Sequence, residues 1–308
     1  MLGRTLVIAN PAAQLGRGYD AALRAERLLR GQEGACTAVD VVFTNAAGDA
    51  RGLAAGSAGY DTIVCVGGDG TIHEVGNGLV GLARAERPRL GVIPMGSGND
   101  YARTLGMAFS VDEAVAQLCA GAVVNADVGT CNGTCFMETI SFGLDAGIAL
   151  DTQERRLRTG TTGLRLYAAS CVDQLLHHKR DYGFTLRVDG GAPERGTLIL
   201  MAVQIGPSYG SGFKICPEAR LDDGLLDVCI AHAPIGTLKG AFIFLRAKNG
   251  YHERFEGIDI RTVRSLELSF DQAPPVQIDG ERYQADTYSL GILAGALDVI
   301  VAPDKEVR

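Results

Sequence analysis

Apolar runs of strand length alternate with stretches of helical composition along the first 125 residues. The strand-like runs cover residues 5–9, 39–44, 62–66 and 90–94. The helix-like stretches cover residues 19–30, an alanine-rich segment ending at residue 58, 72–82 and 111–120. Continuous apolar strands that alternate with helices are typical of a parallel sheet covered on both faces. The pattern therefore predicts an α/β domain, and in such domains ligands bind at the carboxyl ends of the strands.

After about residue 125 the pattern changes to short strands separated by turn residues. These strands are predicted at 184–188, 197–204, 226–231, 266–270, 276–278 and 296–302. One helical stretch, Gly163 to His178, interrupts them and carries an apolar stripe. We therefore expect two domains, an α/β domain over residues 1–125 and a β-rich, sandwich-like domain over residues 126–308. The final strand is also compatible with a position in the first domain.

Composition limits the function classes. The 308 residues are 46% hydrophobic, lack Trp and carry a formal charge of −7, which argues against a nucleic-acid binder. The eight cysteines are scattered, and the first residues do not have the form of a secretory leader. No run reaches the ~18 apolar residues of a membrane-spanning helix. These features favour a reduced, cytoplasmic protein that meets a membrane only from the side.

The strongest candidate site is the glycine loop Gly67–Thr71, between a predicted strand and a predicted helix. Its glycines allow the backbone to approach a phosphate closely, and the helix start adds partial positive charge. Asp69 offers a carboxylate for Mg²⁺, while Thr71 offers a hydroxyl and a helix cap, with Glu74 at capping-box spacing. Taken alone, the loop is also consistent with an ordinary, well-capped turn.

A second glycine loop, Pro94–Asp100, follows the next strand along the chain. Asn10 and Pro11 follow the first strand in the same way. Because the carboxyl ends of parallel strands meet at one edge of a sheet, we expect the three segments to converge on one crevice. The loops match neither a Walker P-loop nor the dinucleotide fingerprint, which requires its glycines after the first strand.

The order of four motifs resembles that of the diacylglycerol kinase-like lipid kinases, especially their soluble bacterial branch. The motifs are Gly67–Thr71 with Glu74, Pro94–Asp100, Leu221–Asp227 and Asp279–Glu281. The resemblance covers roughly residues 5–303. It implies a nucleotide-binding α/β domain followed by a β-rich lipid domain, and transfer of the γ-phosphoryl group of ATP to a lipid hydroxyl, most readily that of diacylglycerol. Taken alone, Asp279–Glu281 and Asp222–Gly224 are also consistent with plain turns.

The resemblance carries roles over to individual positions. It makes Glu281 the candidate general base, with Asp279 beside it in the same turn and Asp69 in the catalytic loop. Together with the glycine loops, it gives a predicted ATP-binding set of Asn10, Pro11, Thr44, Gly67, Gly68, Asp69, Gly70, Thr71, Glu74, Gly96, Ser97, Asn99 and Asp100. It also implies an Mg²⁺ site formed by the Asp223 carboxylate with the carbonyl groups of Arg220 and Leu225.

The sequence departs from the family pattern at two positions. Gln14 stands where the first loop usually carries glycine, which leaves the phosphate contacts of the loop from Asn10 to Gln14 open. Ser97 replaces the more usual threonine but keeps its hydroxyl.

The basic residues between Arg155 and Arg187 allow two interpretations, a solvated face or a patch that docks on anionic lipid headgroups. In the second interpretation Arg155, Arg156 and Arg158 contact the membrane. The family also allows a homodimer. Two rival functions remain at this stage: an NAD kinase, which shares the first motif, and a non-catalytic lipid- or nucleotide-binding regulator.

Overall fold

The computed structural model describes residues 1–161 and 164–303, and these form two compact units. The first unit holds Met1–Val128 together with the chain from Ala294 onward, and the second holds Gly129–Leu293. The expected fold class is confirmed, because parallel strands come first and a sandwich-like, mostly antiparallel region follows. Two strands, β5 (Ala122–Cys131) and β15 (Thr287–Val301), run from one unit into the other.

The first unit is built on a parallel sheet in which β3 is central. The strands lie in the order β2 (Cys36–Phe43), β1 (Gly3–Ala9), β3 (Thr62–Gly67), β4 (Arg89–Pro94), and the end of β15. Every residue of β3 is buried, as expected for a strand with both faces covered. The apolar runs in the sequence are therefore the interior of this sheet.

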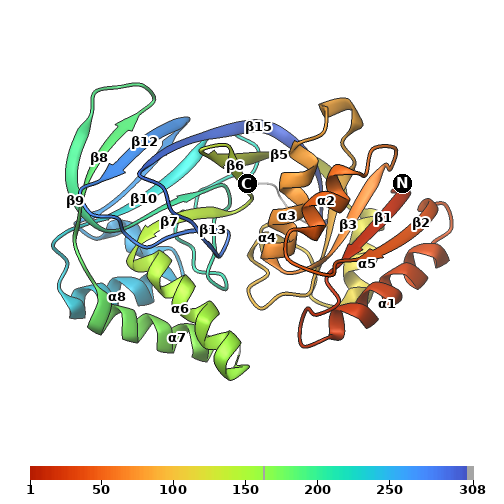
Figure 1. Cartoon of the computed structure of the whole chain (residues 1–308), viewed down its shortest axis with the longest axis horizontal. Coiled ribbons are helices and arrows are strands. Elements are labelled where there is room, and N and C mark those ends of the chain that lie inside the picture. Colours follow the sequence, from red (N-terminus) through yellow and green to blue (C-terminus); the bar gives the residue numbers. More distant parts are fainter. Residues whose placement is uncertain (162–163, 304–308) are drawn as a thin grey trace. The chain divides into compact units, whose positions relative to one another are not determined.

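Helices cover both faces of this sheet (Figure 1). They are α1 (Arg17–Gly31), α2 (Asp49–Ala55), α3 (Asp69–Val80), the 3₁₀ turn η1 (Arg84–Glu86), α4 (Asp100–Thr104) and α5 (Val111–Ala120). Helix α1 packs against α5, and α2 packs against α3. Helix α1 buries Ala21, Ala22, Ala25 and Leu29, which the 3.6-residue period places on one stripe.

The long strand β9 (Glu194–Gln204) organises the second unit. It pairs along one edge with β8 (Tyr182–Val188) and β7 (Thr139–Gly143), and along the other with β10 (Leu226–His232). The remaining strands of this unit are β6 (Thr134–Phe136), β11 (Ile258–Val263), β12 (Ser265–Phe270), β13 (Val276–Ile278) and β14 (Glu281–Arg282). All these pairings are antiparallel.

The helices of the second unit pack on this strand system. They are α6 (Leu144–Thr159), α7 (Leu164–Asp173), the π-helical turn η2 (Gln174–His178), α8 (Thr237–Ala247) and the 3₁₀ turn η3 (Tyr251–Arg254). Ile148, Tyr167 and Ala247 of three helices meet in one buried cluster, and Ile243 joins Ile199 of β9 in another. Among the described residues, no helix combines the length and hydropathy needed to cross a membrane.

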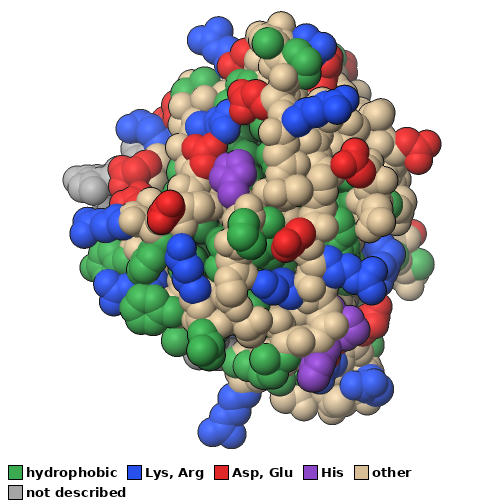
Figure 2. Space-filling view, turned by 90° about the vertical axis from the view of Figure 1, so that its left-hand side faces the viewer, with side chains coloured by type: hydrophobic (Ala, Val, Ile, Leu, Met, Phe, Trp, Pro, Cys, Tyr) green, Lys and Arg blue, Asp and Glu red, His purple; other side chains and the backbone are tan. Residues whose placement is uncertain are grey.

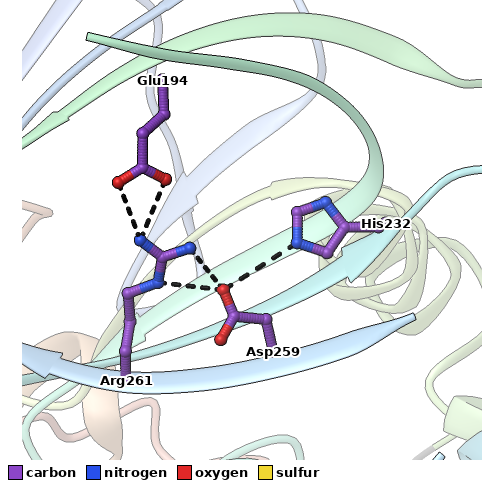
Figure 3. Close-up of polar contacts among 4 residues, drawn as sticks. All are labelled: Glu194, His232, Asp259 and Arg261. Carbon is purple, nitrogen blue, oxygen red and sulfur yellow. Dashed lines mark hydrogen bonds and ion pairs between the residues drawn. The ribbon is translucent and has the colours of Figure 1, made fainter. Parts of the chain in front are cut away.

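A polar network joins three strands of the second unit (Figure 3). Arg261 of β11 donates to both carboxylate oxygens of Glu194 on β9, at 3.2 and 3.1 Å. Arg261 Nε also donates to Asp259 at 2.9 Å, and the same carboxylate lies 3.9 Å from His232 Nε2 on β10. Because the network spans β9, β10 and β11, we assign it to holding these strands together.

The structure contains two helices in the second half that the sequence pattern did not predict, α6 and α8. Helix α8 contains the run Phe242–Leu245, which is apolar and rich in residues that favour strands, so its local composition conceals a helix. The predicted helix at 163–178 is present from Leu164 as α7 and η2. Its first residue lies outside the described residues.

The contact between α2 and α3 generates a stability prediction. A Cβ atom on Gly78 of α3 would lie 2.4 Å from the carbonyl oxygen of Arg51 and 2.7 Å from the Ala54 Cβ. Gly78→Ala should therefore lower the free energy of unfolding by about 1–3 kcal/mol, measured by urea denaturation. The matched control is Gly52→Ala on the exposed side of α2, where an added Cβ meets nothing within 4 Å. Alanine is the better helix former there, so this change should raise stability by up to about 1 kcal/mol. Equal effects of the two changes would contradict the packing argument.

Candidate functional site

Three loops of the first unit follow three neighbouring parallel strands, β1, β3 and β4. Backbone hydrogen bonds tie the loops to the adjacent strands. Asn10 N donates to Val66 O at 3.0 Å, and Met95 N donates to Gly67 O at 2.7 Å. The predicted convergence of these segments at one edge of the sheet is therefore present within this unit.

The two glycine loops touch each other through their backbones at Gly68 and Gly96. A Cβ atom on Gly96 would lie 2.5 Å from the Gly68 Cα, and one on Gly68 would lie 2.8 Å from the Gly96 Cα. No side chain fits at either position without moving backbone. The result is a paired loop of bare backbone beside the first turn of α3, whose exposed N–H groups and dipole favour an anion such as phosphate.

Two amide side chains hold the second loop in place. Asn99 is buried and has a left-handed backbone (φ 54°), and its side chain accepts from Gly96 N at 2.6 Å and donates to Gly96 O at 3.0 Å. Gln14 Nε2 donates to the same carbonyl oxygen at 3.3 Å. Gln14 also has a positive φ of 48°, so it adopts the conformation for which glycine is usual and adds a contact between loops.

Asp69 and Asp100 bring two carboxylates to the same place. Asp69 begins α3, and its Oδ1 accepts a hydrogen bond from Tyr101 N at 3.2 Å. A Cβ atom on Gly98 would lie 3.0 Å from the Oδ2 atoms of both acids, so Gly98 leaves room for them. Oxygen donors of this kind suit the Mg²⁺ that accompanies a nucleotide triphosphate. Ser97 lies exposed in the same loop.

Glu74 makes structural contacts that the sequence pattern did not predict. Its two carboxylate oxygens accept hydrogen bonds from Gly48 N at 2.8 Å and Ala50 N at 3.1 Å, at the start of α2. Glu74 therefore caps the neighbouring helix, whereas its spacing from Thr71 indicated a box on its own helix. Thr44, also in the predicted nucleotide set, donates its backbone N–H to Ala9 O at the end of β1.

In the second unit, Asp279 is buried in the turn between β13 and β14 and holds another backbone segment. Its carboxylate accepts hydrogen bonds from Met137 N at 2.7 Å and from Glu138 N and Thr139 N at 3.0 Å each. Charge-assisted bonds of this type are about twice as strong as neutral ones. The geometry therefore gives Asp279 a positioning role for the turn, with its oxygens engaged by backbone N–H groups.

Glu281 follows directly on this rigid turn and is exposed. It is the first residue of β14, paired with Ile278, and its Oε1 lies 3.4 Å from Gln153 Nε2 of α6. A solvent-accessible carboxylate on a fixed turn has the chemistry of a general base.

Two carboxylates, those of Asp223 and Asp227, lie in the segment after residue 220. Asp223 Oδ1 accepts from Leu225 N at 3.0 Å, while Asp227 is buried and its Oδ2 has no partner among the described residues. Burial and the neighbouring Asp223 carboxylate raise the pKa of Asp227 to about 7. No group of three or more His, Cys, Asp or Glu side chains suited to a metal occurs in the described ranges. The family resemblance assigns a cation here to the Asp223 carboxylate and the carbonyl oxygens of Arg220 and Leu225, which are oxygen ligands of the kind that Mg²⁺ prefers.

An apolar cavity of about 80 Å³ lies within the second unit, between its helices and strands. Its walls come from the inner sides of α6, α7 and α8 and from β9 and β10. A cavity of about 150 Å³ can hold benzene, so this space, about half as large, has room for only a few methylene groups. Composition and periodicity gave no sign of this cavity, because its lining residues come from distant parts of the chain.

Two buried polar side chains border this cavity, Asp145 and Tyr209. Within the described residues, Asp145 Oδ2 and Tyr209 Oη make no hydrogen bond of ordinary geometry, but the two side chains lie close enough to interact with each other. Burial raises the pKa of the Asp145 carboxyl, and burial together with Asp145 raises the pKa of Tyr209 well above 10. Both groups are thus shifted toward protonated forms, which donate hydrogen bonds.

Comparison with known proteins gives the family. The diacylglycerol kinase catalytic domain matches residues 4–131, and the YegS C-terminal NAD kinase beta sandwich-like domain matches residues 138–301. A protein of Pseudomonas savastanoi pv. phaseolicola named "Probable lipid kinase YegS-like" is 30% identical over 281 residues, which cover 87% of this chain and 86% of that protein. This chain belongs to the diacylglycerol kinase-like lipid kinases. A "Diacylglycerol kinase" of Staphylococcus carnosus is 28% identical over 72% of this chain and 70% of its own length.

Solved structures share the fold of this lipid kinase. A crystal structure of a diacylglycerol kinase from Bacillus anthracis str. Sterne superposes with a TM-score of 0.80 at 24% identity, covering 97% of both chains. An NAD kinase from Archaeoglobus fulgidus in complex with ATP superposes with a TM-score of 0.52 at 16% identity, covering 98% of this chain and 94% of that one. The NAD kinase fold is thus a more distant likeness.

The contacts of Asp279 generate a prediction about the turn that carries Glu281. Asp279→Ala removes the acceptor of three backbone N–H groups and should lower the free energy of unfolding by about 3 kcal/mol or more, measured by urea denaturation. Asp279→Asn keeps one carbonyl oxygen and should cost less. If both variants were as stable as the wild type, the positioning role of Asp279 would be wrong.

Proposed function

We propose that this lipid kinase transfers the γ-phosphoryl group of ATP, in the presence of Mg²⁺, to the hydroxyl of a lipid of the diacylglycerol class. The observation that carries the proposal is the backbone contact between Gly68 and Gly96 beside the first turn of α3. We further propose that the enzyme is cytoplasmic and works at a membrane surface, where its ATP and its lipid are both available.

The proposed nucleotide site follows from the requirements of phosphoryl transfer. This reaction depends mainly on positioning and on charge neutralisation. Backbone N–H groups of the Gly67–Thr71 and Met95–Asp100 loops would hold the phosphates. Mg²⁺ neutralises charge on the triphosphate when it is bound, and Asp69 with Asp100 offers the carboxylates that would hold it. A second Mg²⁺ would rest on Asp223 and the carbonyl groups of Arg220 and Leu225, where it stabilises the turn.

Two features support a lipid as the phosphoryl acceptor: the apolar cavity and Glu281. The cavity would hold part of a hydrocarbon chain, since burial of each CH₂ contributes about 0.8 kcal/mol. Glu281 would accept the proton of the lipid hydroxyl as that oxygen attacks the γ-phosphorus, while the bond from this phosphorus to the β–γ bridging oxygen breaks and ADP leaves. Asp279 would keep the turn that bears Glu281 in position through its three backbone hydrogen bonds.

The proposal is tested against its two rivals by one assay. The enzyme is incubated with ATP labelled at the γ-phosphate in three separate reactions. The acceptors in these reactions are total lipid extract, purified dioleoylglycerol and NAD. A labelled lipid extracted into chloroform supports the proposal, and labelled NADP in its place would overturn it in favour of an NAD kinase. Nucleotide binding with no transfer to either acceptor would point to a non-catalytic regulator.

Glu281→Gln tests the general base. The change removes the proton acceptor but keeps the shape of the side chain, so kcat should fall by about 10²–10⁴-fold. ATP affinity, measured by isothermal titration calorimetry, should stay within about twofold, because Glu281 has no role in holding the nucleotide. The matched control is Glu154→Gln, an exposed carboxylate on α6 that pairs with Arg282 at 3.0 Å and should keep normal turnover. Full activity of Glu281→Gln would remove this residue from the base role.

Gly240→Leu tests whether the apolar cavity of the second unit holds a lipid chain. Gly240 lines the cavity from α8, and a Cβ atom there would make ordinary contacts with Leu175 at 3.5 Å and Ile235 at 3.7 Å, so larger side chains extend into the space. The KM for dioleoylglycerol should rise about tenfold or more, while the KM for dioctanoylglycerol changes little. Gly236→Ala, where an added Cβ meets nothing within 4 Å, serves as the control in the same segment. An unchanged chain-length preference would show that the lipid chain lies elsewhere.

A further inference from the structure

Helix α8 is apolar on both of its sides, although only one side is buried. Its inner side packs Ile243 and Ala247 into the unit. Its outer side presents Leu238, Phe242 and Leu245, whose exposed fractions are 88%, 54% and 69%. These three recur at i, i+4 and i+7, so they form one stripe along the helix. A continuous apolar stripe facing water marks a surface that meets an apolar partner.

The neighbouring helical segment extends this stripe. Val172 of α7 and Leu176 of η2 are 56% and 59% exposed. Segment η2 contacts α8, and Lys179, at the end of η2, donates to the carbonyl oxygen of Ile235 at 2.5 Å just before α8. Both segments line the same cavity and cover the same side of the strands of the second unit (Figure 1). We call Val172, Leu176, Leu238, Phe242 and Leu245 the outer helical patch.

The two segments that carry the outer helical patch are rich in basic residues. Residues 165–180 and 237–248 contain six Lys or Arg residues and one acid, in a chain with a formal charge of −7. That acid, Asp173, forms an ion pair with Arg155 at 2.6 Å. Lys239 and Arg246 are exposed on α8 itself, which has no acidic residue. The nearest exposed acids that follow these two segments in the sequence are Asp181, Glu253 and Glu256.

The same contacts revise the sequence-based view of the basic segment. Arg155 is paired with Asp151 and with Asp173, both at 2.6 Å, and its side chain is only 26% exposed. It is therefore engaged within the protein, whereas Lys239 and Arg246 flank exposed apolar side chains. An apolar stripe with basic residues beside it is the composition of a helix that lies in a membrane interface.

We propose that the outer helical patch docks on the surface of a bilayer that carries anionic headgroups. Leu238, Phe242 and Leu245 enter the headgroup region, while Lys239 and Arg246 meet the anionic groups around them. Figure 2 shows one face of the protein, on whose lower part hydrophobic side chains gather among Lys and Arg. The cavity lies directly beneath the same helices, so a lipid chain that leaves the bilayer meets it on the inner side of α8.

The surface is tested by co-sedimentation of the full chain with vesicles of phosphatidylcholine and phosphatidylglycerol (7:3) and of phosphatidylcholine alone. The wild type should bind the anionic vesicles more tightly, and raised salt should weaken that binding. The triple variant Leu238→Ser, Phe242→Ser and Leu245→Ser should bind about 100-fold more weakly. A control with Phe109→Ser and Val123→Ser, two exposed apolar residues of the first unit, should bind like the wild type.

The contribution of the basic residues is tested with the double variant Lys239→Glu and Arg246→Glu. These changes should lower binding to anionic vesicles by at least about 25-fold, since each basic residue accounts for about fivefold, and should matter little on phosphatidylcholine alone. Arg195→Glu with Arg264→Glu, two exposed residues elsewhere in the second unit, is the matched control. Wild-type vesicle binding by either patch variant would overturn the proposal.

Two further measurements distinguish membrane docking from misfolding of the variants and from self-association. Circular dichroism and turnover of dioctanoylglycerol below its critical micelle concentration should be unchanged in the patch variants, which shows that they fold. Sedimentation velocity without vesicles should give the same mass for wild type and variants. A wild-type dimer that the triple variant dissociates, without any vesicle binding, would make the patch an interface between copies and overturn the proposal. Vesicle binding by a wild type that phosphorylates no lipid would uphold the surface while refuting the proposed function.

Discussion

The contact between the backbones of Gly68 and Gly96 is the constraint on which the candidate nucleotide site depends. Each position lacks room for a Cβ atom because the other loop occupies that space. The contact requires β3 and β4 to be neighbours and parallel, so that both loops leave the sheet at the same edge. Asn99 and Gln14 then fix the second loop by binding the carbonyl group of Gly96. Bare N–H groups, the start of α3 and the Asp69 carboxylate are all placed by this one approach.

The second unit fixes the turn that carries Glu281 while leaving that acid exposed. Asp279 places its carboxylate inside the protein, where three backbone N–H groups compensate its burial. The turn thereby fixed carries Glu281 on its outer side. Helices α6, α7 and α8 enclose the cavity from one side, and α8 remains apolar on the side away from it. The proposed lipid-chain cavity and the proposed membrane surface would therefore lie on the two sides of α8.

Several features were readable from the sequence because their causes are local. The buried strands at 62–66 and 90–94 were visible as continuous apolar runs, and the loops after them were visible through their glycines. Other features could not be predicted because they depend on contacts between residues far apart in the sequence. Helix α8 contains strand-favouring residues and becomes a helix through packing in the unit. Glu74 caps a helix 24 residues earlier in the chain, a partner that no spacing rule indicates.

Local patterns were enough to predict the order of strands and helices in the first half, the motifs of a lipid kinase and the candidate residues for phosphate and metal. These depend on periodicity and on residue chemistry, both of which act over a few positions. Only the tertiary structure decided that Asp279 positions a turn, that Glu74 caps α2 and that α8 has one apolar side in water. Each of these follows from contacts between segments far apart in the chain, and the free energy of such contacts depends on folded geometry that local patterns do not contain.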